Sequence, residues 1–277
     1  MKKMIFAAIA GMLLAGCSSD NVEEQGEETV TLRFSGFQVE TESMTRATSA
    51  IGDYVTKLDV WIYESGSEVS ATHQSSGDAG FGSLSLTLNK TKTYTLYAVA
   101  HKANGAATLA DGVISWPDDK VTHSFFYTTT FTPATDTELA CVMNRIVAML
   151  RLETTDAIPS ECKKMRVTID GVYDRWNVVT GGTHQINRVS TINISSTNPD
   201  GTAAFTMYAI VTNENTNHRV TMEAMDADDA VLKSHVLENV PFCINKKTII
   251  SGAFFPDVSG SFSFLASDIE ELTTINF

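Results

Sequence analysis

Apolar and polar residues alternate over many short stretches of this 277-residue chain. In one of them Leu84, Leu86 and Leu88 are separated by single serine or threonine residues. Because successive side chains of a β-strand point to opposite faces of the sheet, a period of two predicts strands with one buried face. Such alternation covers residues 30–35, 55–63, 83–89, 93–100, 164–170, 190–195, 203–211, 218–225, 231–238 and 247–255.

Turn-forming residues separate the alternating stretches. They include Asn104-Gly105, Asp111-Gly112, Gly181-Gly182 and the run Asn-Pro-Asp-Gly at 198–201. Many short strands joined by such turns are typical of β-sandwiches, whose domains have about 100 residues. We therefore predict an all-β fold of two β-sandwich domains in tandem. The boundary is expected at Asn144-Arg145, with one domain over 29–144 and the other over 145–277.

The segment 138–152 has a pattern that also fits a helix. Leu139, Val142, Met143, Ile146 and Leu150 lie at helical spacing, whereas Ile146, Ala148, Leu150 and Leu152 alternate as in a strand. Periodicity alone leaves both interpretations open. We expect a strand, because the rest of the chain is β and because the chain must pass here from one core to the next.

The N-terminus has the features of a secretory signal peptide. Met1-Lys2-Lys3 is positively charged, and the apolar run that follows, 4–15, is shorter than the roughly 20 residues of a membrane-spanning helix. The run ends in Leu14-Ala15-Gly16-Cys17, which resembles the bacterial lipobox. The resemblance implies that residues 1–16 are removed and that Cys17 carries acyl chains, palmitate among them, that anchor the protein in a membrane.

Acidic residues outnumber basic ones. The chain has 33 Asp and Glu against 20 Lys and Arg, a net charge of −13, and loss of Lys2 and Lys3 with the signal peptide lowers it to −15. A surface of this charge repels phosphates, so we expect no nucleic acid among the partners. Residues 17–28 are acidic and poor in apolar side chains, which predicts a solvated tether between the lipid and the folded part.

Beyond Cys17 the chain has three cysteines, Cys141, Cys162 and Cys243. Their number is odd, and no two are spaced as Cys-x-x-Cys. All three stand in apolar, strand-like surroundings, where a cysteine behaves as a small hydrophobic residue. We predict buried free thiols, with a single disulfide bridge as the alternative, and no zinc site.

The sequence has no pattern typical of a catalytic or metal site. It lacks the nucleophile elbow, the phosphate-binding loop and the dinucleotide-binding glycine motif. Asp226, Asp228 and Asp229 are near enough to bind Ca²⁺ but lack the glycine and distal glutamate of a calcium loop, so we prefer a hairpin turn. We predict no catalytic residue, no metal, no cofactor and no enzymatic activity. The histidines occur singly, at His73, His101, His123, His184, His218 and His235.

Three tryptophans, Trp61, Trp116 and Trp176, suggest an alternative function. If exposed, their rings could hold sugar rings, with tyrosines and a Ca²⁺ ion assisting, and the chain would then be a surface glycan-binding lipoprotein. Tryptophans distributed over two cores are, however, more often packing residues. Glycan binding therefore stands as the second hypothesis.

The order of several segments along the chain matches a known family. They are the lipobox at Cys17 and residues 29–34, 44–48, 57–63, 92–100, 143–148, 240–242 and 245–252. This ordered set, which covers nearly the whole chain, resembles the fimbrillin superfamily of the Bacteroidetes, the lipoprotein subunits and anchors of a surface pilus. The acidic stretch after Cys17 also resembles the export signal that sends lipoproteins of these bacteria to the outer face of the outer membrane.

The resemblance implies two transthyretin-like β-sandwich domains and a structural subunit of cell-surface fimbriae that supports cell adhesion. The partners it implies are other fimbrial subunits, joined by strand exchange, in which one subunit fills a groove in the next.

In polymerising members of the superfamily an arginine-specific protease cuts after an arginine that follows the first strand, which releases the lipid and that strand together. Arg46 occupies the matching place, so the resemblance implies cleavage between Arg46 and Ala47. The segment 39–50 is polar and weak in strand signal, which predicts an exposed loop. Anchor subunits keep their lipid and first strand, and a plain loop arginine is the alternative.

The tail 261–277 is the candidate for the donated strand. Removal of the first strand would leave an apolar groove and unpaired backbone groups, which another strand must cover. The tail could instead complete the core of its own C-terminal domain. Its apolar residues are Phe262, Phe264, Ile269, Leu272, Ile275 and Phe277.

Overall fold

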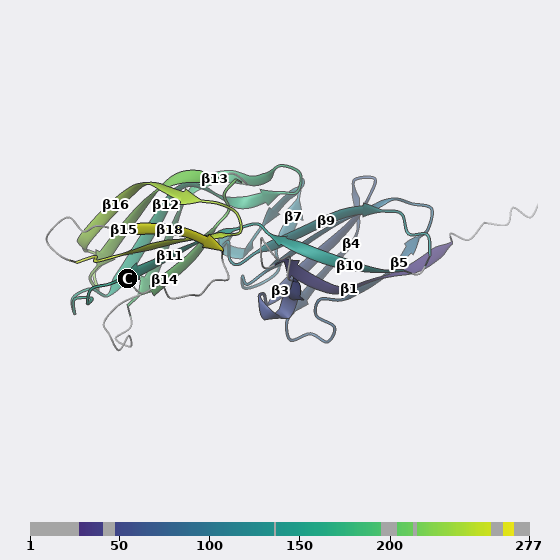
Figure 1. The fold of residues 1–277 in the computed structure, drawn as a ribbon. Coiled ribbons are helices and arrows are strands. Elements are labelled where there is room, and N and C mark those ends of the chain that lie inside the picture. The colour runs from purple at the N-terminus through teal and green to yellow at the C-terminus, as the bar shows by residue number, and fades with distance from the viewer. Residues whose placement is uncertain are drawn as a thin grey trace, which may run out of the picture.

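The computed structural model describes residues 28–40, 48–135, 137–194, 204–212, 215–255 and 263–268. These residues form strands β1 to β18 and two short 3-10 helices, Ile51–Asp53 and Pro117–Asp119, with no α-helix among them. No helix in these ranges is long and apolar enough to cross a membrane. The predicted all-β class is confirmed, and the strands form curled sheets in two groups along the molecule (Figure 1).

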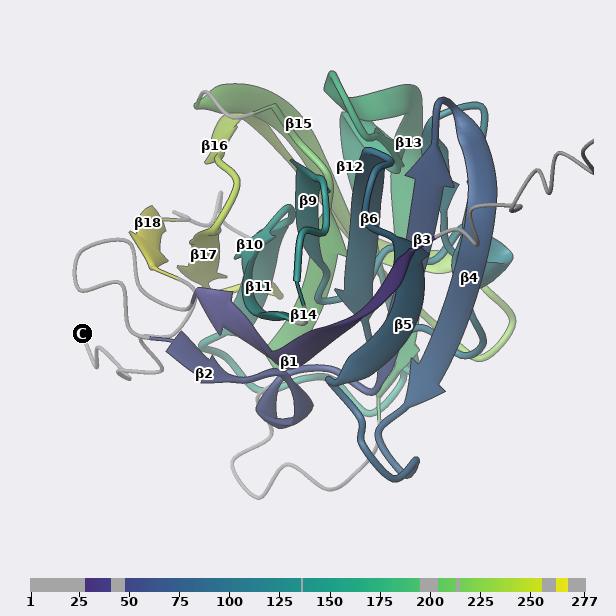
Figure 2. The same cartoon turned by 90° about the vertical axis from the view of Figure 1, so that its right-hand side faces the viewer.

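The first group is an eight-stranded sheet. Its strand order is β2-β1-β10-β9-β6-β3-β4, and β5 pairs with β1 alongside this path. Figure 2 views this end of the molecule, with β1 in purple across it. The strands are β1 (Thr29–Glu40), β2 (Thr48–Ala50), β3 (Lys57–Glu64), β4 (Ser67–Ser75), β5 (Leu84–Asn89), β6 (Tyr94–His101), β9 (Phe125–Phe131) and β10 (Thr137–Arg145).

The second group is a sandwich of a four-stranded and a six-stranded sheet. The orders are β14-β11-β17-β18 and β16-β15-β12-β8-β7, with β13 paired to β12. The hairpin β7–β8 comes from the first half of the chain but extends the six-stranded sheet through β12. The strands are β7 (Thr108–Ala110), β8 (Val113–Ser115), β11 (Ala148–Thr154), β12 (Lys164–Asn177), β13 (Gly181–Asn193), β14 (Ala204–Ala209), β15 (Thr216–Met225), β16 (Val231–Phe242), β17 (Lys246–Gly252) and β18 (Ser263–Asp268).

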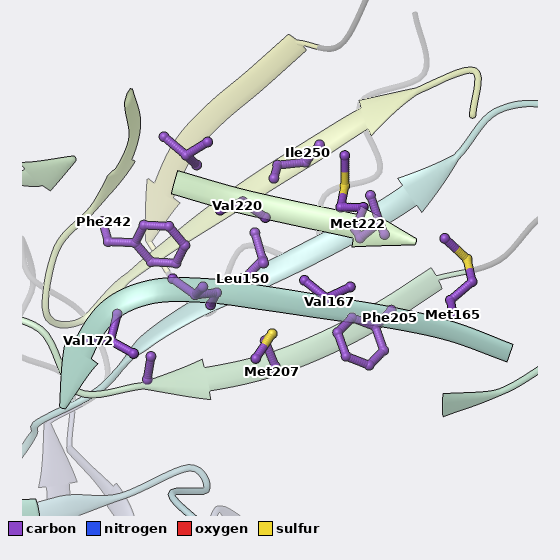
Figure 3. Close-up of a cluster of buried hydrophobic side chains, with 14 of the residues drawn as sticks. Leu150, Met165, Val167, Val172, Phe205, Met207, Val220, Met222, Phe242 and Ile250 are labelled. Atoms are coloured by element: carbon purple, nitrogen blue, oxygen red, sulfur yellow. The ribbon is translucent and has the colours of Figure 1, made fainter. Parts of the chain in front are cut away.

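Three clusters of buried side chains lie along the molecule. The N-terminal core fills the curl of the eight-stranded sheet with residues such as Leu32, Phe34 and Leu96. The C-terminal core lies between the two sheets of the sandwich, where Leu150, Phe205 and their neighbours meet (Figure 3). A junction cluster joins the two groups of strands. It contains Trp61, Val99, Ala103, Ala107, Ile114, Trp116, Val121, Phe126, Ile146, Val147 and Ile210.

The junction cluster covers the outer face of the eight-stranded sheet, so β3 is buried on both faces there. Leu58, Val60 and Ile62 of β3 point into the N-terminal core, as the alternation predicts. Trp61, on the opposite face, belongs to the junction cluster and is also buried. The expectation of strands with one buried face is therefore wrong for this part of β3, because a second layer packs on the face expected to be exposed.

The segment 138–152 is extended, as we predicted. It is divided between β10 of the first sheet and β11 of the sandwich, with Ile146 and Val147 between them. The Ile146 N–H donates to the carbonyl of Ser124, and the carbonyl of Val147 accepts from the Asn245 N–H. These two bonds hold the crossing segment to both groups of strands.

Candidate functional site

Strand β1 is paired along both of its edges. On one edge β10 runs parallel to it, with Phe34 opposite Leu139. On the other edge β5 runs antiparallel to its first half, with Phe34 opposite Leu84, and β2 pairs with its last residues. Removal of β1 would therefore leave unpaired backbone groups on both β10 and β5, which is the kind of edge that accepts an added strand.

The inward side chains of β1 are anchored in the N-terminal core. Leu32, Phe34 and Phe37 are each about 1% exposed. Phe34 packs edge-on against the ring of Phe131, with 5.7 Å between ring centroids. A register shift between Ser35 and Gln38 turns Phe37 back into the core. Burial of three such side chains contributes on the order of 5 to 9 kcal/mol, at about 1.5 to 3 kcal/mol each.

The described residues begin at residue 28, and in sequence β1 is followed by residues 41–47, which lie outside the described residues, and then by β2. The two long neighbours of β1, β5 and β10, are far from it in sequence, so no tight hairpin ties β1 to either. After residue 47 the chain is fixed again, because Ile51 and Val55 are buried in the same core. Gly82 lies so close that a Cβ there would come within 2.8 Å of Ile51 Cγ2. The residues from 48 onward are therefore anchored in the N-terminal core by their own side chains, independently of β1.

Most of the predicted site residues lie outside the described residues. This applies to Cys17, Arg46 and Ala47, and to five of the tail residues, Phe262, Ile269, Leu272, Ile275 and Phe277.

The remaining tail residue, Phe264, is in β18. There its backbone pairs with Ile250 of β17, so in this chain β18 adds a strand to its own sandwich. The prediction of a loop over 39–50 is wrong at both ends, since β1 continues to Glu40 and β2 begins at Thr48. Backbone pairing between β1 and β2 holds residues 38–40 and 48–50 as strands, which their polar sequence did not predict.

A buried polar network lies where the two groups of strands meet. Arg145 Nε donates to His123 Nε2 at 2.8 Å, and the Arg145 guanidinium also donates to Asn245 Oδ1 of the sandwich. The guanidinium lies over the Phe125 ring, and Tyr208 of β14 stacks on His123. Burial, together with the positive charges of Arg145 and Lys102, lowers the pKa of His123 to about 3.

A second polar network is centred on Asp59 of β3, on the same face of this strand as Trp61. The Asp59 carboxylate is fully buried and contacts His73 Nδ1 at 2.7 Å and His101 Nε2 at 2.8 Å. It also accepts the Ala107 N–H, while His101 Nδ1 accepts the Ala103 N–H. These bonds fasten the loop before β7 to the first sheet, which is a structural role. Alternation along β3 places Asp59 on an outward face, so its burial could not be predicted from this pattern.

The three tryptophans are packing residues, as we predicted from the sequence in preference to a sugar-binding platform. Trp61 and Trp116 belong to the junction cluster and are only 3% exposed, and Trp176 packs against the same cluster. Phe126 and Trp176 pack together there, with 5.9 Å between ring centroids. A platform built from these rings for sugar binding is therefore not present on the surface.

The remaining predictions concern cysteines and metals. Cys141, Cys162 and Cys243 form no disulfide within the described residues, and the first two are buried and the third half-buried. Asp226 closes the turn between β15 and β16 by accepting the N–H groups of Asp228 and Ala230, so the hairpin interpretation is confirmed. In the described part of the chain, no three His, Cys, Asp or Glu residues gather as a metal site would require.

Residues 22–265 match the model of a family of unknown function, DUF6562. The chain belongs to this family. No curated protein matches its sequence.

Solved structures similar to this DUF6562 member include proteins from Bacteroides and Porphyromonas species. A candidate adhesin from Bacteroides ovatus has a TM-score of 0.55 and 10% identity, with 86% of this chain and 95% of that chain covered. A candidate polysaccharide-binding protein from Bacteroides thetaiotaomicron has a TM-score of 0.54 and 12% identity, with 87% and 99% covered. The fimbrial anchor protein Mfa2 from Porphyromonas gingivalis has a TM-score of 0.47 and 11% identity, with 87% and 98% covered. At these identities the likeness to the two Bacteroides structures is one of fold alone.

Proposed function

We propose that the chain is a structural subunit of a cell-surface fimbria that supports adhesion, either a processed pilin or a lipid-retaining anchor. The observation that carries the proposal is the placement of β1, which is paired along both edges, buried in the N-terminal core and followed in sequence by residues 41–47. Arg46 lies in that segment. One cut there would free a whole strand.

The architecture is consistent with this role. We propose that the chain forms two transthyretin-like sandwich domains in tandem, 29–144 and 145–277, with the hairpin β7–β8 of the first added to the six-stranded sheet of the second. Structures of similar fold include candidate adhesins from Bacteroides species. In this proposal the chain acts by binding other subunits and has no catalytic role.

Cleavage after Arg46 would release β1 and expose an apolar groove in the N-terminal core. Loss of Leu32, Phe34 and Phe37 removes on the order of 5 to 9 kcal/mol of apolar burial. That is a large part of the 5 to 15 kcal/mol that stabilises a typical domain. The groove is therefore expected to bind a strand from a second copy or another subunit.

The tail 261–277 has the spacing to replace β1. An offset of 232 residues places Phe264 at the position of Leu32 and Ile269 at that of Phe37. The same offset matches Phe262 to Val30, and Ala266, which is smaller, to Phe34. Because β18 pairs with β17 in the free chain, donation requires β18 to leave this edge position and insert into the neighbouring subunit.

Membrane attachment is the second element of the proposal. We place a lipid on Cys17 and the chain on the outer face of the outer membrane before any processing. Cys17→Ala should then give an uncleaved precursor or a soluble protein in detergent partitioning. Unchanged partitioning of this variant would rule out Cys17 as the lipid site without bearing on β1.

Processing is tested with Arg46→Ala in the expressing cells. The variant should persist as the full-length lipoprotein and form no polymer ladder on an immunoblot, whereas Arg33→Ala, a matched change at an exposed position within β1, should behave as wild type. If an arginine-specific protease yields the same fragments from Arg46→Ala and wild type, cleavage at this site is wrong. A ladder from a chain that retains β1 would overturn the exchange mechanism as well.

A further inference from the structure

A hollow of about 740 Å³ is lined by residues of β12, β13 and β15 in the six-stranded sheet, together with Thr212. Pairing between β12 and β15 ends at Ile169 and Val220. At that point both strands have register shifts against their other partners, β12 after Ile169 and β15 after His218. The strands separate beyond these two bulges, and the hollow opens between them. Its volume is within the range of about 300 to 1,000 Å³ typical of small-ligand sites.

Two amide side chains in the hollow are held in fixed orientations by Gly171. The Gly171 N–H donates to Asn187 Oδ1 at 3.1 Å, and Gln185 Nε2 donates to the Gly171 carbonyl at 2.9 Å. Gly171 has a φ of 72°, and a Cβ there would lie 3.3 Å from Gln185 Nε2. Glycine is therefore required for this arrangement.

These bonds determine what the amides present to a ligand. Asn187 Nδ2 is a donor and Gln185 Oε1 is an acceptor, and among the residues that the structure describes neither atom has a hydrogen-bond partner. A further amide, that of Asn217, lines the same hollow and is likewise unbonded within the described ranges. A fixed donor beside a fixed acceptor suits neighbouring hydroxyl groups, each of which both donates and accepts.

The rest of the wall is rigid. His218 Nδ1 donates to the carbonyl of Asp170 at 2.8 Å, and its Nε2 accepts the Thr216 hydroxyl at 2.8 Å, so both ring nitrogens are occupied. The ring packs edge-on against Phe242 of the C-terminal core. Tyr173 lines the hollow with its ring close to Gly182, where a Cβ would be 2.9 Å from Tyr173 Cδ2. The site is therefore pre-organised rather than formed from mobile side chains.

Charge in the hollow disfavours ionic ligands. Its wall carries one carboxylate, Asp170, and one guanidinium, Arg219, whose Nε contacts Glu238 at 3.2 Å. The chain as a whole has a net charge of −13, which repels anions. A ligand that carries hydroxyls without charge fits best.

We propose that this hollow binds a neutral carbohydrate, whose adjacent hydroxyls engage Asn187 and Gln185. It differs from a tryptophan platform, since all its contacts come from β12, β13, β15 and the residues beside them. It does not depend on the fimbrial role, because β1 and the tail take no part in it.

The test uses the full-length chain in detergent and four probes, maltoheptaose, mannotriose, a β-galactan oligosaccharide and heparin, with calorimetry as the readout. Wild type should bind at least one neutral probe and should not bind heparin. Asn187→Asp keeps the acceptor for the Gly171 N–H and removes the donor, so affinity should fall at least tenfold with the melting temperature unchanged. Asn193→Asp, the same change farther along β13, should bind within twofold of wild type.

A second variant keeps the test decisive if Asn187→Asp unfolds. Asn217→Asp, at an exposed position, should also weaken binding at least tenfold. The proposal is overturned if no neutral probe binds wild type, if heparin is the probe that binds, or if folded variants at 187 and 217 bind as well as the Asn193→Asp control.

Discussion

The N-terminal and C-terminal cores contain similar side chains but are connected differently. The C-terminal core rests on strands joined to a spatial neighbour by a short turn, as β12 is to β13 and β15 to β16. The N-terminal core depends on β1, which pairs with β5 and β10 but is joined to neither by a hairpin. The N-terminal core can therefore lose the strand β1 through a single cut, whereas release of β12 or β15 from the C-terminal core needs two cuts, one on each side of the strand.

The largest expected effect comes from removal of β1. A chain that begins at Ala47 should lose on the order of 5 to 9 kcal/mol from the N-terminal core, because Leu32, Phe34 and Phe37 are absent. Hydrogen exchange should rise strongly in β9 and β10 and stay nearly unchanged in β12 and β15. Equal loss of protection in both regions would show that the two cores unfold as one unit.

A matched pair of substitutions compares the intact cores. Phe34→Ala in the first core and Phe205→Ala in the second should each cost about 3 to 5 kcal/mol of unfolding free energy. Because the two side chains lie in separate clusters, the double variant should be additive within about 0.5 kcal/mol in denaturant titration. Strong non-additivity would mean that the junction cluster couples the cores.

The junction is tested by pH. The lowered pKa of His123 keeps it uncharged in the folded chain, while the unfolded histidine takes up a proton below its ordinary pKa of 6.5. The contribution of uncharged His123 to the free energy of unfolding is therefore fully present above pH 6.5. It falls as the pH is lowered toward 3, by about 2 kcal/mol between pH 7.5 and 5. His123→Gln keeps an acceptor for Arg145 Nε, and it should remove this part of the pH dependence of the free energy of unfolding. Identical slopes in variant and wild type would contradict this assignment.

The smallest effect concerns two buried thiols that report on the two cores. Burial raises the pKa of Cys141, in the first core, to about 12, and it also raises the pKa of Cys162, in the second. Both should react slowly with a disulfide reagent in a Cys17→Ser chain. Phe34→Ala should accelerate Cys141 alone, and Phe205→Ala should accelerate Cys162 alone, as read by mass spectrometry. Acceleration of both thiols by either change would argue against separate cores.

Strands with a clear alternation could be predicted from the sequence, because one face of each packs on a core. β4 was missed because it is an edge strand with few apolar residues, and its structure comes from pairing with β3. β9 was missed because Phe125 and Phe126 are adjacent, and each packs in a different cluster.

The site was predictable in part. The burial of Leu32 and Phe34 of β1 agrees with the alternation of its apolar residues. The burial of Asp59 and the hollow beside Gly171 did not follow from the pattern, because they depend on packing at the junction and on bulges, which a period of two does not encode. Sequence spacing also could not indicate that β18 pairs with β17 in the free chain.

The most direct test of the central claim, that β1 occupies a groove which another strand can fill, uses two acceptor chains and one peptide. The first acceptor spans 47–259 and lacks β1 and the tail; the second spans 29–259 and retains β1. A peptide of residues 261–277 should bind the first acceptor one to one and raise its melting temperature, with weakened binding when Phe264 is changed to Asp. Failure to bind the first acceptor, or equal binding to both, would contradict the account.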